Sequence, residues 1–374
     1  MYEIINNYLK RLLKESTPAA PVWNIESIRQ GKKPHWNYID GCMVTALNLL
    51  SSISGDDSYA RFAEDFINYY VDEEGNILGY SMDKYNLDDI NEGRVLFPLY
   101  EKTGNEKYKK AIENLHDQIL GQPRTETGNF WHKQIYPHQI WLDGIYMAQV
   151  FSALYEKNFG HGDYSDIVKQ ITNVEKLMKD PATGLYFHGC DVSKQAFWAD
   201  PVTGCSKNFW LRSIGWFLIA LSDLAEIMDS TSAEPIRRIL KDLIINISEY
   251  ADPETGMYYQ VVNKGELTGN YLETSGSAMV AYAMLKAARL GIVEERYAGM
   301  GQKTFDGICK KYLKETKEGL SLSGICLVAG LGPENNPRRD GTFEYYISEP
   351  VVENDAKGVA PFILCYTEIL RRIK

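Results

Sequence analysis

The sequence lacks paired cysteines, long apolar runs and an excess of positive charge, and each absence excludes a class of protein. Its 6 cysteines stand far apart without a CxxC pair, which argues against a zinc site or a redox motif and for free thiols in a reducing compartment. No apolar run approaches the roughly 20 residues that span a bilayer. The formal net charge is −10, whereas nucleic-acid binding requires a basic surface. We therefore expect neither a membrane nor a nucleic-acid partner.

Motifs that bind metals and nucleotides are also missing. The sequence contains no HxxxH pattern, no acidic cluster with metal-ligand spacing, no glycine-rich phosphate loop and no GxSxG motif. We therefore expect no metal and no cofactor. The first residues, MYEIINNYLKRLLKE, have an acid as their first charged side chain and apolar residues at helical spacing. A secretion signal begins with basic residues, so the sequence predicts a cytoplasmic protein.

What the sequence does contain is helical periodicity from end to end. Near the C-terminus, apolar residues follow the spacing i, i+3, i+4, i+7 and i+11, which forms one stripe on a helix. These residues are Val359, Phe362, Ile363, Tyr366 and Leu370. Alternating strand patterns are short and lie beside turns, as at 256–262. The sequence therefore predicts an all-α protein.

A turn pattern recurs five times between these helices. An acidic residue or a threonine leads to a glycine, which apolar or aromatic residues follow, at 72–78, 125–131, 181–187, 253–259 and 317–322. Each interval between these glycines can hold two helices, which is typical of a helix-pair repeat. A period near 60 residues gives about six pairs in 374 residues. We predict one (α/α)6-barrel domain over 1–374; an open helical solenoid is the alternative. In a ring the glycine turns gather at one end, where we expect the functional residues.

Asp143 is the first candidate for chemistry. It lies between apolar residues in IWLDGIYM, where an unpaired charge costs several kcal/mol. Trp141 stands two residues before it, and a second acidic pair occurs at Asp88 and Asp89. A carboxylate against an indole and near another carboxylate has a raised pKa, so we expect Asp143 to hold a proton at neutral pH and act as a general acid. The alternative is a helix cap or a buried, hydrogen-bonded Asp.

Asp88 is the second candidate. Asp88 and Asp89 open a helix that we expect to continue through Leu99. Asn86 and Asp88 are both good helix caps, which is the structural alternative to a catalytic role. Two acids that flank a substrate fit glycosidic chemistry, although their separation is not visible in a sequence.

Arg212 and Trp216 are four residues apart and therefore share a helix face, with Trp210 just before them. An arginine beside two indoles can bind a substrate carboxylate while the rings stack on sugar. The alternative is an arginine packed on core aromatics. Ser206 and Asn208 are expected to cap the same helix.

Four further residues lie in segments rich in polar and aromatic side chains. His132, Lys133 and His188 are polar residues on glycine-turn loops, where the alternative is a surface or capping residue. Tyr38 is either a pocket residue or a core aromatic. The stock of 25 Tyr and 7 Trp can serve a core or a cleft in which rings stack on sugars, and a core position is the default for any single aromatic residue.

Seven blocks, spread over most of the chain, resemble the unsaturated rhamnogalacturonyl hydrolases, glycoside hydrolase family 105. They are LDDINEG at 87–93, LFPLYEKTG at 96–104, GNFWHK at 128–133, YPHQIWLDGIYM at 136–147, TGCSKNFWLRSIGW at 203–216, LETSGSAM at 272–279 and YYISEPVVENDAKGVAPFIL at 345–364. The resemblance implies the (α/α)6 barrel independently of the repeat. It also implies that the enzyme hydrates the C4=C5 double bond of an unsaturated uronic acid, after which the hemiketal rearranges and the glycosidic bond breaks.

The resemblance also implies roles for the candidates. Asp143 gives a proton to C4 and deprotonates the attacking water, while Asp88 holds sugar hydroxyls and keeps Asp143 protonated by like-charge repulsion. Four aromatic residues are expected to line the pocket, namely Tyr38, Trp141, Trp210 and Trp216. Four polar residues are expected to contact the substrate, namely His132, Lys133, His188 and Arg212. Arg212 is the expected partner of an anionic or hydroxyl group of the substrate.

The sequence thus predicts a hydrolase that removes 4,5-unsaturated galacturonic acid from the non-reducing end of lyase-generated rhamnogalacturonan (pectin) fragments. One alternative is an unsaturated glucuronyl hydrolase acting on glycosaminoglycan-type disaccharides. The others are a conventional inverting glycosidase and a non-catalytic sugar-binding helical protein. The expected partner is a small acidic oligosaccharide, and we expect a monomer because no exposed apolar stripe stands out.

Overall fold

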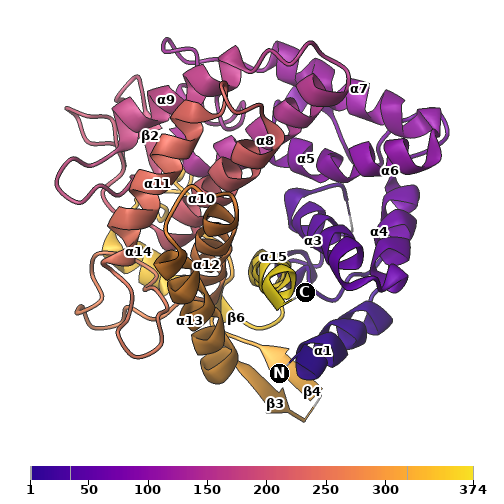
Figure 1. The fold of residues 1–374 in the computed structure, drawn as a ribbon. Helices are drawn as coiled ribbons and strands as arrows, with labels where there is room; N and C mark the ends of the chain where they lie inside the picture. Colours follow the sequence, from indigo (N-terminus) through magenta and orange to yellow (C-terminus); the bar gives the residue numbers. More distant parts are fainter. Residues whose placement is uncertain (1, 34, 318, 374) are drawn as a thin grey trace.

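Six helical positions form an inner ring in the computed structural model, which describes residues 2–33, 35–317 and 319–373. The ring consists of α3 (Tyr38–Ser54), α5 (Asp88–Asn91) with the 3-10 helix η2 (Glu92–Val95), α8 (Leu142–Asn158), α10 (Leu211–Ile227), α12 (Thr274–Arg289) and α15 (Ala356–Ile373). Each position packs on the next, and α15 packs on α3, so the ring closes (Figure 1). The predicted (α/α)6 barrel is confirmed, and the open solenoid is wrong.

A second layer of helices surrounds the ring. It consists of α1 (Tyr2–Glu15), α4 (Asp57–Tyr70), α7 (Glu106–Gly121), α9 (Ser165–Met178), α11 (Glu234–Ser248) and α13 (Glu295–Tyr312). The first and last helices form the pair that joins the two ends of the chain: the hydroxyl of Tyr366 donates to Oδ1 of Asn6 at 3.4 Å. The two layers follow the amphipathic patterns: α10 is buried continuously over 211–225, whereas α11 buries one stripe.

Shorter elements connect the pairs. The helical ones are α2 (Ile25–Arg29), the 3-10 helix η1 (Met82–Lys84), α6 (Leu96–Thr103) and α14 (Phe343–Ser348). The strands are β1 (Gln139–Trp141), β2 (Gly189–Asp191), β3 (Leu313–Thr316), β4 (Gly319–Leu322), β5 (Ile325–Cys326) and β6 (Val351–Val352). They form antiparallel pairs β1–β2, β3–β4 and β5–β6. Within the described ranges, no helix is long and apolar enough to cross a membrane.

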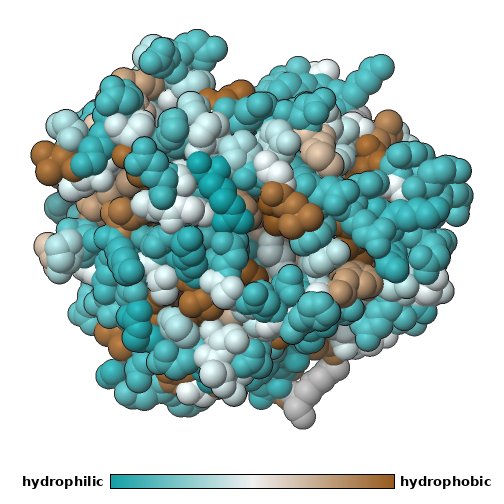
Figure 2. Space-filling view, turned by 90° about the horizontal axis from the view of Figure 1, so that it is seen from above, coloured by the Kyte–Doolittle hydropathy of each residue, from teal (hydrophilic) through white to brown (hydrophobic). Residues whose placement is uncertain are grey.

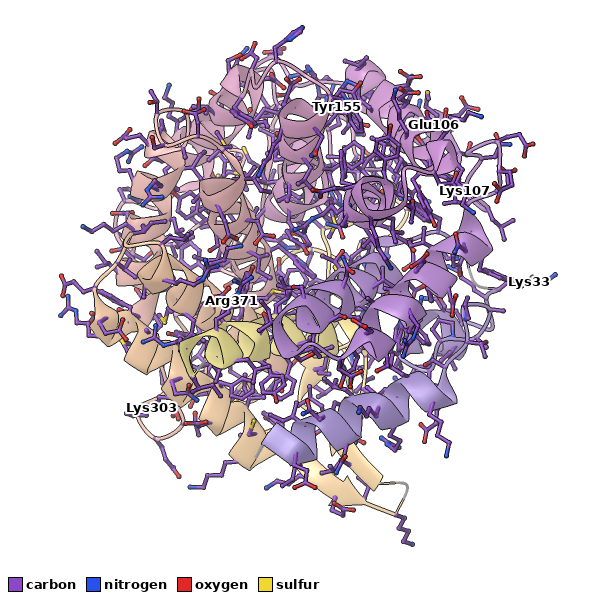
Figure 3. The ribbon with its side chains drawn as sticks, turned by 45° about the vertical axis from the view of Figure 1, so that its right-hand side comes forward. Lys33, Glu106, Lys107, Tyr155, Lys303 and Arg371 are labelled. Atoms are coloured by element: carbon purple, nitrogen blue, oxygen red, sulfur yellow. The ribbon has the colours of Figure 1, made fainter. Side chains whose placement is uncertain are left out.

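The five repeated glycines have one structural role in common. Each follows an outer helix and has a positive φ, from 69° at Gly184 to 104° at Gly319. Each turn also packs on the next outer helix around the ring: Gly75 lies against α7, and Gly319 lies against α1. Figure 3 labels two residues at such contacts: Lys107 of α7, whose side chain pairs with Glu73 of the turn, and Lys303 of α13. The repeat thus joins neighbouring pairs, and the chemistry lies in the segments that follow the turns.

The helix expected to run from Asp88 through Leu99 is interrupted. A 3-10 turn, η2, separates α5 from α6. Gly93 lies in this turn, and a side chain there would meet Leu115 and Phe151. Helices α7 and α8 pack closely on this turn, where the chain is wound more tightly as a 3-10 helix. The apolar spacing of the sequence alone does not reveal this change of winding.

On the outside, large hydrophobic residues are dispersed. In the view of Figure 2, hydrophobic patches are scattered among hydrophilic residues and form no continuous band on that face. Exposed members such as Ile135, Phe197 and Val202 contrast with a core that runs through both helical layers. The monomer stays a prediction.

Candidate active site

A cavity of about 240 Å³ lies at the end of the barrel where the inner helices begin. Tyr38 begins α3, Asp88 begins α5, and Asp143 lies in the first turn of α8. All three line the cavity, together with His132, Lys133 and Trp141. The remaining lining residues include Glu26, Ser27, Gln30, Lys32, His35, Asn37, Asn86, Asp89, Tyr136, Met147, Val328, Ala329 and Arg339.

The pairing of β1 with β2 places His188 opposite Asp143. Trp141 pairs with Gly189, and the amide of Leu142 donates to the carbonyl of His188 at 3.1 Å. Nε2 of His188 consequently lies 3.3 Å from Oδ2 of Asp143, while its Nδ1 lies 2.7 Å from the hydroxyl of Tyr346. The approach to Asp143 lacks hydrogen-bond geometry, so Oδ2 of Asp143 and Nε2 of His188 are buried polar atoms without a hydrogen bond in the described chain.

The expected pKa of Asp143 is wrong in its direction. Burial raises the pKa of this carboxyl, but the imidazole of His188, together with His132 and a backbone amide, lowers it by more, so the pKa lies below its ordinary value. The indole of Trp141 does not act on Asp143 as expected. Its ring stacks between His132 and Tyr136, with ring centroids 4.6 Å from each. Asp143 is therefore a carboxylate at neutral pH.

Asp88 is compensated by a neighbouring cation. Its Oδ2 lies 2.5 Å from Nζ of Lys133, and its Oδ1 lies 3.5 Å from Nε2 of His132. Burial lowers the pKa of Lys133, but Asp88, together with Tyr136 and Asp89, raises it by more, so the lysine is charged. Burial also lowers the pKa of His132 to about 4, which makes this imidazole neutral at pH 7. The expected repulsion from Asp88 does not decide the protonation of Asp143, because the pKa of Asp143 is lowered and Lys133 pairs with Asp88.

Asp89 has the protonation behaviour that the sequence suggested for Asp143. Burial, and after it the Asp88 carboxylate, raises the pKa of Asp89 to about 7. Nδ2 of Asn86 donates to Oδ1 of Asp89 at 3.0 Å, and the Asp89 carbonyl accepts from the indole of Trp36 at 2.6 Å. This acid lines the cavity beside Asp88.

Arg212, Trp210 and Trp216 lie behind the cavity and do not line it. The Arg212 guanidinium is buried and donates to the carbonyl of Cys326 at 2.5 Å and to Oγ of Ser275 at 3.3 Å. The Trp210 ring stacks near Tyr346, and the Trp216 ring stacks on Tyr146. The structure thus gives these three residues partners inside the protein, and their contact with substrate stays a prediction.

The two expected caps of α10 serve other segments. The residue before α10 is Trp210, and α10 has no side-chain cap. Nδ2 of Asn208 donates to the carbonyl of Gly341 at 2.8 Å, and Oγ of Ser206 accepts from the amide of Gly189 at 3.3 Å. Both side chains thus form hydrogen bonds with segments that are distant in the sequence. Sequence spacing does not reveal such contacts.

Several cavity residues escaped the sequence analysis. Tyr136 and Arg339 line the cavity, and the segment around α2 contributes Glu26 and Lys32. Tyr136 stands inside YPHQIWLDG and could have been found there, but the segments around 26–32 and 339 carry no recognisable chemical pattern. Among the described residues, no group of three or more His, Cys, Asp or Glu side chains could hold a metal ion.

Comparison with known proteins gives consistent relatives. A family model described as Glycosyl Hydrolase Family 88 matches residues 14–373. A solved family 105 glycoside hydrolase from C. acetobutylicum ATCC 824 is 40% identical, with a TM-score of 0.86, covering 91% of this chain and 96% of that chain.

Two curated proteins are similar over part of the chain. The 24.9 kDa protein in the picA locus of Rhizobium radiobacter is 40% identical over 215 residues, which cover 55% of this chain and 90% of that protein. The unsaturated rhamnogalacturonyl hydrolase YesR of Bacillus subtilis (strain 168) is 25% identical over 239 residues, which cover 61% of this chain and 65% of YesR.

Proposed function

The chain belongs to the glycoside hydrolases of families 88 and 105, which comprise unsaturated uronyl hydrolases, and we propose that this member acts on unsaturated galacturonic acid at the non-reducing end of rhamnogalacturonan fragments. The resemblance read from the sequence is thereby confirmed at the level of the family. The finer substrate assignment draws support from YesR, whose name gives a rhamnogalacturonyl substrate.

The observation that carries the proposal is the placement of Asp143 and the Asp88–Lys133 pair in one cavity. We assign Asp143 the proton transfers. It gives a proton to C4 of the C4=C5 bond, the positive charge develops at C5 and the ring oxygen, and water adds to C5 while losing a proton to Asp143. The hemiketal then opens, and the hemiacetal left at C1 releases the second sugar as an alcohol. Atoms balance with one water consumed.

Substrate binding itself supplies the protonated form of Asp143 in this proposal. Without substrate the carboxyl is ionised, because His188 and the groups around it lower its pKa against burial. A bound uronate brings a second negative charge and displaces water, and both effects raise the pKa of a neighbouring carboxyl. Asp88, neutralised by Lys133, remains an acceptor for sugar hydroxyls. The indole of Trp141 lines the cavity and can stack on the sugar ring. Tyr38, His132 and Lys133 line the same cavity.

The test is loss of the ultraviolet absorbance of the conjugated double bond in an unsaturated rhamnogalacturonan disaccharide. We expect turnover by the wild type and a loss of about 10³-fold or more in Asp143→Asn. Asp65→Asn removes an exposed carboxylate on α4 and should leave turnover unchanged. If the absorbance stays constant with the wild type, unsaturated glucuronyl disaccharides are tested next. If the absorbance stays constant with both substrates, the hydration mechanism is rejected. A cytoplasmic location, a monomer and a single domain stay predictions.

A further inference from the structure

We propose that Arg339 binds the carboxylate of the unsaturated uronic acid. The inference rests on the proposed function, because it names the group in the same cavity that recognises the acid of that substrate. Arg339 belongs to the connection between β5 and α14 and lines the cavity together with Asp88 and Asp143.

The backbone of Arg339 is fixed on both sides. Its carbonyl accepts from the amide of Gly332 at 2.8 Å, and its amide donates to the carbonyl of Asn336 at 3.2 Å. The guanidinium reaches a space left by Gly330: a Cβ on Gly330 would stand 3.1 Å from Nη1 of Arg339 and 3.5 Å from the Trp141 ring. The missing side chain at residue 330 thus leaves room for a cation beside the indole.

Arg339 lines the cavity, and among the described residues no carboxylate there pairs with its guanidinium. Lys133 forms a 2.5 Å ion pair with Asp88, and no acidic side chain of the described chain forms an ion pair with Arg339. Lys32 also lines the cavity but is exposed to solvent, which screens its charge. Arg212 is committed to the Cys326 carbonyl and Ser275 behind the cavity.

The chemistry of the substrate matches this cation. A guanidinium presents parallel N–H donors that bind a planar carboxylate through two hydrogen bonds, and a partly buried site weakens the competition from water. In a 4,5-unsaturated uronate the carboxylate is attached to C5, the carbon that receives water. A clamp on the carboxylate therefore orients the C4=C5 bond against Asp143, and it supplies the local attraction that a chain of net charge −10 otherwise lacks for an anion.

The experiment compares two substrates and three variants. The substrates are the unsaturated uronyl disaccharide as the free acid and as its neutral carboxyl methyl ester. For Arg339→Gln we expect kcat/KM on the free acid to fall roughly 10- to 100-fold, mostly through KM, and on the ester to change by less than about 3-fold. Arg339→Lys keeps the charge but not the two-donor geometry, and it should fall between wild type and Arg339→Gln.

Arg338→Gln is the matched control. Arg338 is the neighbouring arginine, but its side chain is 54% exposed and pairs with Glu349 at 2.8 Å outside the cavity. It should leave kcat/KM unchanged on both substrates. Thermal unfolding of each variant shows whether the fold is kept, and Arg339→Lys provides the test if Arg339→Gln does not fold.

Three outcomes separate the proposals. A loss confined to the free acid supports Arg339 as the carboxylate ligand. An equal loss on acid and ester, or none on either, overturns it while the proposed function stands. If the wild type turns over no unsaturated uronyl substrate, the proposed function fails; calorimetric binding of the free acid to Asp143→Asn, with and without Arg339→Gln, then decides on Arg339 alone.

Discussion

Nε2 of His188 lies 3.3 Å from Oδ2 of Asp143, although the two residues are 45 positions apart in the chain. The short strands β1 and β2 bring them together, and the hydroxyl of Tyr346 fixes the other side of the imidazole at 2.7 Å. A residue from the next helix pair therefore helps to set the protonation state of Asp143. This protonation state depends on the folded barrel, because the two residues are close only there.

We predict that His188→Gln raises the pKa of Asp143. The imidazole lowers this pKa against the opposing effect of burial, so its removal leaves burial to act with less compensation. Carbon NMR of the carboxyl groups, with Asp143→Asn to identify the signal, measures the shift directly. A folded-state pKa below the unfolded value contributes stability above that unfolded value, and this stability is lost as pH falls through the folded pKa. His188→Gln should lose this contribution at neutral pH.

Tyr346→Phe serves as the comparison for that variant. It removes only the hydroxyl bound to Nδ1 and keeps the imidazole beside Asp143. The pKa of Asp143 should move less than in His188→Gln. A carboxyl signal that titrates at the same pH in wild type and His188→Gln would show that the imidazole does not control the charge of Asp143.

Asp89 leads to a prediction about stability and pH. Its folded pKa is raised to about 7, so its neutral form is favoured by folding. Such a group contributes stability that is fully present below its unfolded pKa and is lost as pH rises through about 7. Asp89→Asn cannot ionise. The unfolding free energy of Asp89→Asn minus that of wild type should therefore increase by about 2 to 4 kcal/mol from acidic to mildly alkaline pH. Urea denaturation at each pH measures this difference.

The exposed Asp65→Asn is the reference for that measurement, since it removes an acid without changing the cavity. Its difference from wild type should be independent of pH. If the curves of Asp89→Asn and wild type run parallel across pH 5 to about 9, Asp89 is ionised throughout and the expected shift is absent.

The fold was predictable because the repeat lies in local sequence. Helical spacing and the glycine turns depend on residues close in the chain, and Gly75 and Gly319 adopt the positive φ that a turn pattern suggests. Closure was not visible, because it depends on α15 packing on α3 across the whole chain. The resemblance supplied closure where periodicity left the solenoid open.

The site was predictable in part for the same reason. Asp88, His132, Lys133, Trp141 and Asp143 lie in compact blocks, and all of them reach the cavity. The charge state of Asp143 was not predictable from its neighbour Trp141, because packing directs that indole to His132 and Tyr136. Side-chain direction and long-range partners are tertiary facts, and they also explain why Arg212 stood out in the sequence while Arg339 did not.

A buried ion network inside the barrel yields a third prediction. Asp223 lies 2.6 Å from Nη2 of Arg94 and 2.8 Å from Nζ of Lys286, and all three side chains are less than 10% exposed. Asp223→Asn leaves two buried cations without this partner, so the free energy of unfolding should fall by about 3 to 5 kcal/mol in urea denaturation. Burial raises the pKa of Asp223, but Lys286 and Arg94 lower it to about 2, so its contribution persists above the unfolded value and is lost as pH falls through about 2.

The control for this network is an exposed ion pair. Glu294 and Arg296 lie 3.1 Å apart with side chains that are 73% and 67% exposed. Glu294→Gln should leave the melting temperature unchanged, because solvent screens such pairs. Equal melting temperatures for Asp223→Asn and Glu294→Gln would mean that the buried network contributes nothing net.

The glycine turns offer a final prediction that separates backbone strain from packing. Gly75 has φ 82°, and a Cβ there would stand 2.5 Å from Cβ of Lys110 and 3.0 Å from the amide nitrogen of Ala111. Gly104, at the end of α6, has φ 64° and open space around the same position. Both Ala variants meet the cost of a left-handed residue, about 1 kcal/mol, but only Gly75→Ala must also push α4 and its turn away from α7.

We therefore expect Gly75→Ala to lower the free energy of unfolding by about 1 to 3 kcal/mol more than Gly104→Ala. Chemical denaturation measures the difference, and hydrogen exchange should show the added loss of protection at the contact between this turn and α7. Because the same contact recurs around the ring, equal costs for the two variants would mean that the repeated glycines serve only their own turns. A larger cost at Gly75 would show that the close contact at this glycine stabilises the packing of neighbouring helix pairs. The ring that positions the cavity would then depend on such contacts.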